Sequence, residues 1–244
     1  MQIVGLVPAR YASSRFPGKP LARIGDRPMI AWVVEGARRS RRLRDVIVAT
    51  DDPRIEKVCR ERGIPAVLTS PDHPTGTDRL AEVARKLPDD VVVNVQGDEP
   101  AIDGGVIDAV VEALLADPGA AIATAAHPAD PGAGTDPNRV KVVVDRRGRA
   151  LYFSRSPIPW AAAGSEGPPL LQHVGVYAYR RPFLLEYVSL PPTPLERAEG
   201  LEQLRALEHG HAIAVAAVDW RGAPVDVPED VPRAESLLRE LGRL

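Results

Sequence analysis

The stretch VVVNVQGDEP at residues 91–100 joins a near-continuous apolar run to a polar end. A strand that is buried on both faces has this composition, because both alternating sets of side chains must then be apolar. Two similar runs are IVGLVPA at residues 3–9 and DVIVATD at residues 45–51. The pattern predicts an α/β fold in which a mostly parallel sheet, built from βαβ units, is covered by helices.

Helical patterns alternate with these strands in the first half of the chain. PMIAWVVEGARRS (28–40) has Pro28 near its first turn, PRIEKVCRERG (53–63) ends in a glycine, and TGTDRLAEVARKL (75–87) begins with Thr and Asp. PAVLTS (65–70) is a further short strand. We therefore expect strands and helices to alternate up to residue 100.

The second half has a different pattern, with two strand-like segments around DRRG that indicate a hairpin. The elements expected there are the hairpin at 138–155, a strand at 168–181, one helix at 193–210, a strand at 212–219 and a final helix at 228–244. WAAAGSEGPP at 160–169 is expected to be a flexible loop. We predict a single domain over residues 1–244, with an insertion at about residues 135–190 that carries the hairpin and whose exposed strands could form a dimer interface.

Composition excludes several classes of protein. The 31 Lys and Arg residues against 33 Asp and Glu residues give no basic excess for nonspecific nucleic-acid binding, although a local cluster could still bind a small anion. The single cysteine, Cys59, cannot form an intrachain disulfide, which favours a reducing, cytoplasmic compartment. No apolar run approaches the roughly 20 residues that a membrane span needs.

The loop that follows the first strand is rich in basic and hydroxyl side chains. Phosphates commonly bind at this place in open parallel sheets. The residues suited to a triphosphate are Arg10, Ser13, Ser14, Arg15, Gly18 and Lys19. The loop is neither a Walker A motif, since Pro20 follows the lysine, nor a G-x-G-x-x-G motif. On composition alone, a solvated surface loop is an equally good interpretation.

Two aspartates follow apolar strands and suit a magnesium ion. Asp98 ends the run quoted above, and Asp226 lies in GAPVDVPED. Mg²⁺ is commonly held by one or two carboxylates together with phosphate oxygens of the substrate. The alternative for each is a helix cap, because both precede predicted helices; Asp103, Glu229 and Asp230 are expected in the first turns of those helices. A basic loop and two strand-end carboxylates together point to nucleotidyl transfer.

Motifs along nearly the whole chain resemble those of the 3-deoxy-manno-octulosonate (Kdo) cytidylyltransferases, also called CMP-Kdo synthetases. They are VPARYASSRFPGKPL, MIAWVVEGAR, IVATDD, TGTDRLAEV, VVVNVQGDEP, ALYFSRSPIPW, HVGVYAYRR, PLERAEGLEQLRALEHG and PVDVPED. Each motif alone is weak, but the ordered set is specific, and it separates the chain from sialic acid cytidylyltransferases, which share only the broader loop pattern. The resemblance implies a Rossmann-like, GT-A-like nucleotidyltransferase sheet with helices on both faces.

The resemblance also implies the reaction of CTP with Kdo to give CMP-Kdo and pyrophosphate, with Mg²⁺ as cofactor, in a cytoplasmic homodimer that activates Kdo for lipopolysaccharide synthesis. Neither a nucleic acid nor a membrane is expected as a partner. By position, the implied triphosphate contacts are Arg10, Ser13, Arg15 and Lys19, and the implied cytidine contacts are Gly76, Thr77, Arg79 and Gln96. The implied magnesium ligands are Asp98 and Asp226, and the implied catalytic residues are Lys19, Arg10 and Asp98. The implied contacts of the sugar acid are Arg155, His173, Tyr177, Glu202 and Gln203.

Other interpretations of these residues remain open from the sequence. His173 alone is typical of a packed or surface histidine, Tyr177 of a sheet residue, and the Glu202–Gln203 pair of a solvated helix face. A cytidylyltransferase for an altered Kdo, such as an amino derivative, is the nearest alternative activity. A noncatalytic nucleotide-binding protein is a further alternative, and a nucleic-acid-binding module is the weakest.

Overall fold

A computed structural model describes residues 1–13, 15–130, 132–164 and 167–244. Ser14 of the predicted phosphate loop and residues 165–166 of the predicted loop at 160–169 lie outside the described residues. The chain divides into two compact units. The first unit comprises residues 1–108, 180–188 and 221–244, and the second comprises residues 109–179 and 189–220. The single-domain organisation with an insertion at 135–190 stays a prediction.

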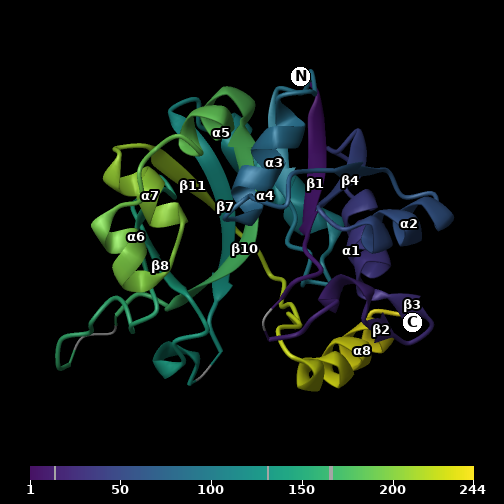
Figure 1. Cartoon of the computed structure of the whole chain (residues 1–244). Helices are drawn as coiled ribbons and strands as arrows, with labels where there is room; N and C mark the ends of the chain where they lie inside the picture. The colour runs from purple at the N-terminus through teal and green to yellow at the C-terminus, as the bar shows by residue number, and fades with distance from the viewer. Residues whose placement is uncertain (14, 131, 165–166) are drawn as a thin grey trace. The chain divides into compact units, whose positions relative to one another are not determined.

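The first unit contains four parallel strands, as the apolar runs predict. They are β1 (Ile3–Ala9), β4 (Asp45–Thr50), β5 (Ala66–Leu68) and β6 (Val91–Asn94) (Figure 1). Their order is β6-β1-β4-β5. The three valines that begin β6 are at most 1% exposed, which confirms that this strand is buried on both faces.

Helices of the first unit begin and end at the signals in the sequence. The elements are α1 (Met29–Arg38), α2 (Pro53–Glu61), α3 (Gly76–Ala84), α5 (Arg181–Tyr187) and α8 (Val231–Glu240), with a short hairpin of β2 (Arg23–Ile24) and β3 (Arg27–Pro28). Thr75 caps α3 by accepting hydrogen bonds from the backbone N–H groups of Thr77 and Asp78. Gly63 follows α2 with a φ of 65°, which favours glycine. With right-handed crossovers, this strand order places α1 and α2 on one face of the sheet and α3 on the other.

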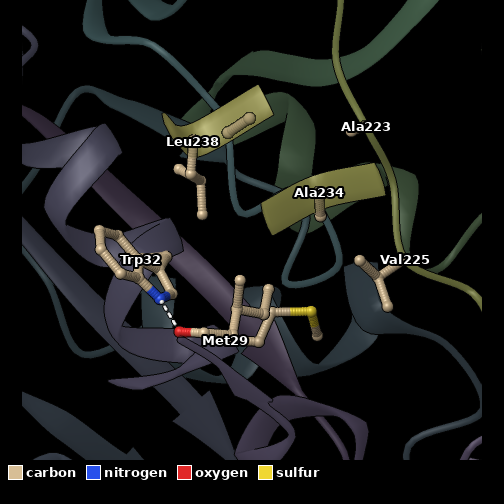
Figure 2. Packing of buried hydrophobic residues seen from close by; sticks show 8 residues of the cluster. Met29, Trp32, Ala223, Val225, Ala234 and Leu238 are labelled. Carbon is tan, nitrogen blue, oxygen red and sulfur yellow. Dashed lines mark hydrogen bonds between the residues drawn. The ribbon is translucent and has the colours of Figure 1, made fainter. Parts of the chain in front are cut away.

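The C-terminal helix packs against α1 and the β2–β3 hairpin in a cluster of fully buried side chains. Figure 2 shows Met29 and Trp32 of α1 facing Ala234 and Leu238 of α8, with Val225 beside them. The indole N–H of Trp32 donates to the carbonyl oxygen of Ile24 at 2.9 Å. Because Ala223 and Val225 belong to the same cluster, the segment that leads to Asp226 is held in place by apolar burial.

The second unit contains a mixed sheet of five strands. They are β7 (Ala120–Pro128), β8 (Lys141–Val144), β9 (Ala150–Ser154), β10 (Leu171–Arg180) and β11 (Ala212–Ala217). The order is β11-β7-β10-β8-β9, in which β11 and β7 are parallel and the other pairs are antiparallel. The boundary between the units falls within α4 (Gly104–Ala116). α4 is the helix expected after Asp98, whereas neither β7 nor α5 is among the elements expected from the sequence.

The hairpin prediction is confirmed, and the prediction of one helix at 193–210 is wrong. β8 and β9 pair with Lys141 opposite Ser154, and the turn closes with a hydrogen bond from Gly148 N–H to Asp145 O at 3.1 Å. Residues 193–210 form two helices, α6 (Pro194–Glu199) and α7 (Gln203–Glu208), because Gly200 adopts a φ of 62° and ends the first. Among the described residues, no helix has both the length and the apolar character to cross a membrane.

Candidate active site

The residues predicted to contact the nucleotide and the metal all belong to the first unit. They lie at the end of β1, in the turn after β6, at the start of α3 and in the segment before α8. The carboxyl ends of parallel strands lie at one edge of a sheet, which is where ligands bind in open α/β folds. The fold therefore brings segments from four parts of the chain to the edge where a nucleotide is expected.

Lys19 joins the two predicted magnesium ligands. Its Nζ donates to Oδ2 of Asp98 at 3.1 Å and to Oδ1 of Asp226 at 3.4 Å. Arg15 also donates to Oδ1 of Asp226, at 3.0 Å. The Lys19 side chain is 15% exposed, whereas Asp98 and Asp226 are 33% and 45% exposed. The two carboxylates thus meet at one ammonium group and still present surface to a ligand.

Backbone hydrogen bonds fold the loop that carries Lys19. The N–H of Gly18 donates to Tyr11 O at 2.8 Å, and the N–H of Lys19 donates to Phe16 O at 3.1 Å. Gly18 has a φ of 73°, and a Cβ there would lie 3.2 Å from the ring of Tyr11. The hydroxyl of Ser13 accepts from the N–H of Phe16 at 3.4 Å, and Arg10 is exposed at the end of β1. A glycine at position 18 is therefore needed for the turn that presents Lys19.

The helix caps expected as an alternative role for the two aspartates come from neighbouring residues. The Asp230 carboxylate accepts from the N–H groups of Asp226 and Val227, at 2.8 and 3.1 Å. Before α4, the Asp103 carboxylate accepts from the N–H of Gly105 at 2.7 Å. The carboxylates of Asp98 and Asp226 instead bind the cationic side chains of Lys19 and Arg15. They are therefore not used as helix caps, which agrees with the predicted role as metal ligands.

Two hydrogen bonds hold the segment that contains Asp226 against the turn that contains Asp98. The N–H of Val225 donates to Asp98 O at 2.9 Å, and the N–H of Ala223 donates to Oε1 of Glu99 at 2.9 Å. Burial, together with the neighbouring charge of Asp98, raises the pKa of Glu99 to about 8. The sequence places Glu99 only in the polar end of the strand, and its hydrogen bond to the segment before Asp226 is visible only in the structure.

Gly76 and Gly97 both lie against Pro8 near the end of β1. A Cβ on Gly97 would lie 2.7 Å from the carbonyl oxygen of Pro8, and one on Gly76 would lie 3.4 Å from the Pro8 ring. Gln96 is partly buried beside Gly97, and Thr77 is buried in the first turn of α3. Three of the predicted cytidine contacts, Gly76, Thr77 and Gln96, thus lie where the start of α3 and the turn after β6 approach β1.

Arg79, predicted to contact cytidine, is 0% exposed. Its guanidinium group donates to the hydroxyl of Thr69 and lies 3.2 Å from Oδ2 of Asp51. A side chain with no exposed surface cannot contact a ligand in this conformation, so the predicted contact is corrected to an indirect one. Arg79 joins the segments that follow β4 and β5, and so supports the loops at this edge of the sheet.

The donor set at Asp98 and Asp226 fits a magnesium ion that keeps substrate oxygens among its ligands. Both carboxylates contact the same ammonium nitrogen, so they already share one cation. Among the described residues, there is no group of three or more His, Cys, Asp or Glu side chains arranged to hold a metal. Two carboxylates alone suit Mg²⁺, which commonly binds through one or two carboxylates plus phosphate and water.

The residues predicted to contact the sugar acid all belong to the second unit. Arg155, directly after β9, donates from Nε to Glu199 O at 2.7 Å, from Nη1 to Pro137 O at 2.9 Å and from Nη2 to Gly200 O at 3.5 Å. Three of its five N–H donors thus meet backbone carbonyls, which fixes the guanidinium plane against the break between α6 and α7. Lys141, which is fully buried, donates from Nζ to Asp136 O and Arg155 O.

Three other predicted sugar contacts lie close together. The rings of His173 and Tyr177 have centroids 5.4 Å apart. Burial lowers the pKa of His173 to about 3, so its imidazole is neutral at pH 7. Burial raises the pKa of Tyr177, and the nearby charges of Tyr179 and Glu202 act in the same direction, which places Glu202 near this phenol. Gln203 is buried at the start of α7.

Comparison with known proteins defines the class and then the family. A family model described as cytidylyltransferase matches residues 4–213, so the chain is a cytidylyltransferase. A 3-deoxy-manno-octulosonate cytidylyltransferase from Leptospira interrogans is 50% identical over 232 residues, covering 94% of this chain and 93% of the relative. The mitochondrial enzyme of that name from Arabidopsis thaliana is 47% identical over 243 residues, covering 98% and 84%. The chain belongs to the 3-deoxy-manno-octulosonate cytidylyltransferase family.

Solved structures agree with this assignment. A CMP:2-keto-3-deoxy-manno-octonic acid synthetase complexed with CTP superposes with a TM-score of 0.94 at 42% identity, covering 99% of this chain and 100% of the other. A putative glucose-1-phosphate thymidylyltransferase from Bacillus anthracis superposes with a TM-score of 0.65 at 16% identity, covering 98% and 96%, which is a likeness of fold alone. The predicted fold class, a mixed α/β nucleotidyltransferase fold with a mostly parallel sheet, is confirmed.

Proposed function

We propose that the protein transfers the CMP group of CTP to the anomeric hydroxyl of Kdo, giving CMP-Kdo and pyrophosphate. The bond that forms joins the anomeric oxygen to the α-phosphorus, and the bond that breaks joins that phosphorus to the bridging oxygen of pyrophosphate. The observation that carries the proposal is the pairing of Lys19 with Asp98 and Asp226, in a chain that belongs to this family.

The first unit supplies the groups that bind CTP. Arg10, Arg15 and Lys19 bring three positive charges to the end of β1, and the Ser13 hydroxyl lies in the same loop. Their charge favours the triphosphate and the departing pyrophosphate. Gly76, Thr77 and Gln96 lie beside the cytidine in this proposal, with Arg79 supporting them from beneath the surface.

Magnesium is the proposed cofactor, with Asp98 and Asp226 as its protein ligands. Their contact with a single ammonium group supports this assignment. When bound, Mg²⁺ would shield the triphosphate and polarise a phosphoryl oxygen. Lys19 keeps the two carboxylates from repelling each other before the substrate binds, and it remains within reach of the phosphates afterwards.

The second unit supplies the groups that bind the sugar acid. Arg155 is the proposed partner of the Kdo carboxylate, because its guanidinium plane is already fixed by backbone carbonyls. The polar groups of His173, Tyr177, Glu202 and Gln203 are proposed for the hydroxyls. A preorganised set of this kind lowers the entropy lost on binding.

We also propose a setting for the reaction: a cytoplasmic homodimer, formed through the insertion at 135–190, that activates Kdo for lipopolysaccharide synthesis. The single buried cysteine suits a reducing compartment. Exposed apolar side chains in this part of the chain, Leu151 and Trp160, support an interface there. Light scattering at micromolar concentration should give a dimer mass, and a monomer mass would contradict the proposed assembly.

The test of the activity is pyrophosphate release by purified protein with CTP, Mg²⁺ and Kdo. We expect release only when all three are present, and little release when UTP, ATP or GTP replaces CTP. Release that does not depend on Kdo, or that is equally fast with every nucleotide, would contradict the proposal. A catalytically inert protein that still binds CTP would favour a noncatalytic nucleotide-binding role.

A further inference from the structure

β10 contains a bulge between the two predicted sugar contacts His173 and Tyr177. His173 lies opposite Ala126 of β7, whereas Tyr177 lies opposite Thr124. Five residues of β10 thus face three residues of β7. In a regular strand, positions 173 and 177 would be about 13 Å apart, but the bulge places them opposite positions only about 7 Å apart. Two extra residues leave both side chains on the same face, because side chains alternate with a period of two.

The bulge explains why the two rings touch. Their centroids are 5.4 Å apart, and the edge-to-face contact of Phe153 with His173, at 5.2 Å, holds the imidazole from another side. Without the bulge, positions 173 and 177 would lie about 13 Å apart along the strand, and the imidazole and the phenol would not lie side by side. The geometry that suits a polyhydroxy acid therefore depends on whatever stabilises the bulge.

Thr124 is the residue that hydrogen-bonds to the bulge. Its hydroxyl lies 3.1 Å from Val174 O and 2.8 Å from Val176 O, the carbonyl groups on either side of the bulge centre. It also lies 2.9 Å from Nε2 of His173. The side chain is 0% exposed, so water cannot replace these bonds.

These three distances indicate which nitrogen of His173 carries the proton. Two carbonyl oxygens, which only accept, face the Thr124 hydroxyl against one ring nitrogen, which favours donation of the single hydroxyl proton toward the carbonyls. In that arrangement the hydroxyl oxygen accepts from Nε2 of His173, which then carries hydrogen. The imidazole is neutral at pH 7, so Nδ1 has no proton and can only accept.

We propose that Thr124 is a positioning residue for sugar binding: it holds the bulge that brings His173 to Tyr177 and fixes His173 as the tautomer whose Nδ1 accepts a hydrogen bond. This inference rests on the proposed function and deepens it. The group of the sugar acid that meets Nδ1 is a hydroxyl, because a carboxylate has no proton to donate at neutral pH. The carboxylate of the substrate must accordingly bind elsewhere, and Arg155 is its proposed partner.

The tautomer can be measured in the unmodified protein. Nitrogen-15 spectra of labelled histidine separate protonated from unprotonated ring nitrogens, and a His173→Gln variant assigns the signal. We expect His173 to carry its proton on Nε2 at pH 7. A proton on Nδ1 would overturn the proposal, whatever the activity of the enzyme.

The kinetic test uses Thr124→Val, which removes the hydroxyl and keeps the branched shape. We expect the KM for Kdo to rise by about 10-fold or more, because the one hydroxyl that bonds to the bulge and to His173 is removed, while the KM for CTP is unchanged. Thr124→Ser should restore the KM for Kdo, and Thr135→Val, an exposed threonine of the same unit, should have no effect. An unchanged KM for Kdo in Thr124→Val would overturn the proposal.

These outcomes are distinguishable from failure of the proposed function. If the wild-type protein does not use Kdo, the proposed function fails, and the tautomer measurement still decides the role of Thr124 on its own. If Thr124→Val does not fold, Thr124→Ser and the spectra of the wild type decide the question. If the wild type uses Kdo and the spectra show the Nδ1-protonated ring, the function stands and the inference about Thr124 falls.

Discussion

The ammonium group of Lys19 lies 3.1 Å from a carboxylate oxygen of Asp98, and the same ammonium also binds Asp226. This places one cation between two anions at the edge of the sheet where a triphosphate is expected. We predict that Lys19→Ala lowers kcat/KM by about 100- to 1,000-fold, because a preorganised charge at the departing pyrophosphate is lost. The fall should be measured by steady-state pyrophosphate release.

Arg15→Ala is the matched control, because Arg15 binds the same oxygen of Asp226 but is 65% exposed. Its effect on kcat/KM should be much smaller than that of Lys19→Ala. The free energy of unfolding of both variants should lie within about 1 kcal/mol of the wild-type value, since each ion pair is at least partly exposed. Equal losses of activity in the two variants would contradict the special role of Lys19.

The second prediction separates metal binding from helix capping. Asp98→Asn and Asp226→Asn should raise the Mg²⁺ concentration needed for half-maximal rate, because each removes one anionic ligand. Binding of Mn²⁺, followed by electron paramagnetic resonance in the presence of CTP, should weaken in parallel.

Asp230→Asn is the control for that experiment, because its carboxylate accepts from the backbone of Asp226 and Val227. It should lower the free energy of unfolding by less than about 1 kcal/mol, because asparagine keeps an oxygen that can accept from the backbone, and it should have little effect on the Mg²⁺ requirement. If Asp230→Asn shifted the Mg²⁺ requirement as much as Asp226→Asn does, the assignment of Asp226 as a ligand would be wrong.

The third prediction concerns the buried guanidinium of Arg79. Arg79→Met should lower the free energy of unfolding by about 3 kcal/mol, because it leaves Asp51 without its cation. Urea denaturation measures this, and Arg85→Met, an exposed arginine at the end of the same helix, should cost little. A stable Arg79→Met variant whose only defect is a higher KM for CTP would restore the direct contact with cytidine.

How far the sequence predicts this structure depends on the kind of signal. Strands such as Val91–Asn94 are predictable because burial on both faces leaves a continuous apolar run. The break at Gly200 is missed because the helical pattern continues across it, and only the φ of 62° reveals the end of α6. The strand β7 is missed because alanine, which fills much of it, favours helices and is depleted in strands.

The same distinction holds for the candidate site. Asp98 is predictable because a carboxylate just after an apolar strand is costly without a role, and Lys19 because it lies in the basic loop that follows the first strand. The expectation that Asp226 follows a strand is wrong, since β11 ends at Ala217 and Asp226 lies in an irregular segment. A direct contact of Arg79 with a ligand is not predictable in this way, because the sequence motif that contains Arg79 does not show that its side chain is buried. Thr124 is missed because its importance comes from a bulge in a partner strand almost 50 residues away, although one hydroxyl within IATAA is a weak signal.

The fourth prediction is a dependence of stability on pH. The pKa of His173 is lowered to about 3 in the folded state from 6.5, so protonation favours the unfolded chain. Its contribution to stability is fully present above about pH 6.5 and is lost as the pH falls toward 3, at up to about 1.4 kcal/mol per pH unit. His173→Gln should therefore reduce the slope of the free energy of unfolding against pH between about 4.5 and 6.5.

The exposed His209 provides the control for this measurement. His209→Gln should leave the slope unchanged in urea titrations over the same pH range. Identical slopes for the wild type, His173→Gln and His209→Gln would show that His173 is not held neutral by its surroundings.

The central claim is that Kdo is the sugar acid this cytidylyltransferase activates. The most direct measurement compares kcat/KM for Kdo with that for an amino derivative of Kdo, with CTP and Mg²⁺ present and the nucleotide sugar identified by mass spectrometry. We predict that CMP-Kdo forms together with an equal amount of pyrophosphate, and that Kdo has the larger specificity constant. Turnover of the amino derivative or another acid sugar, without turnover of Kdo, would contradict the claim.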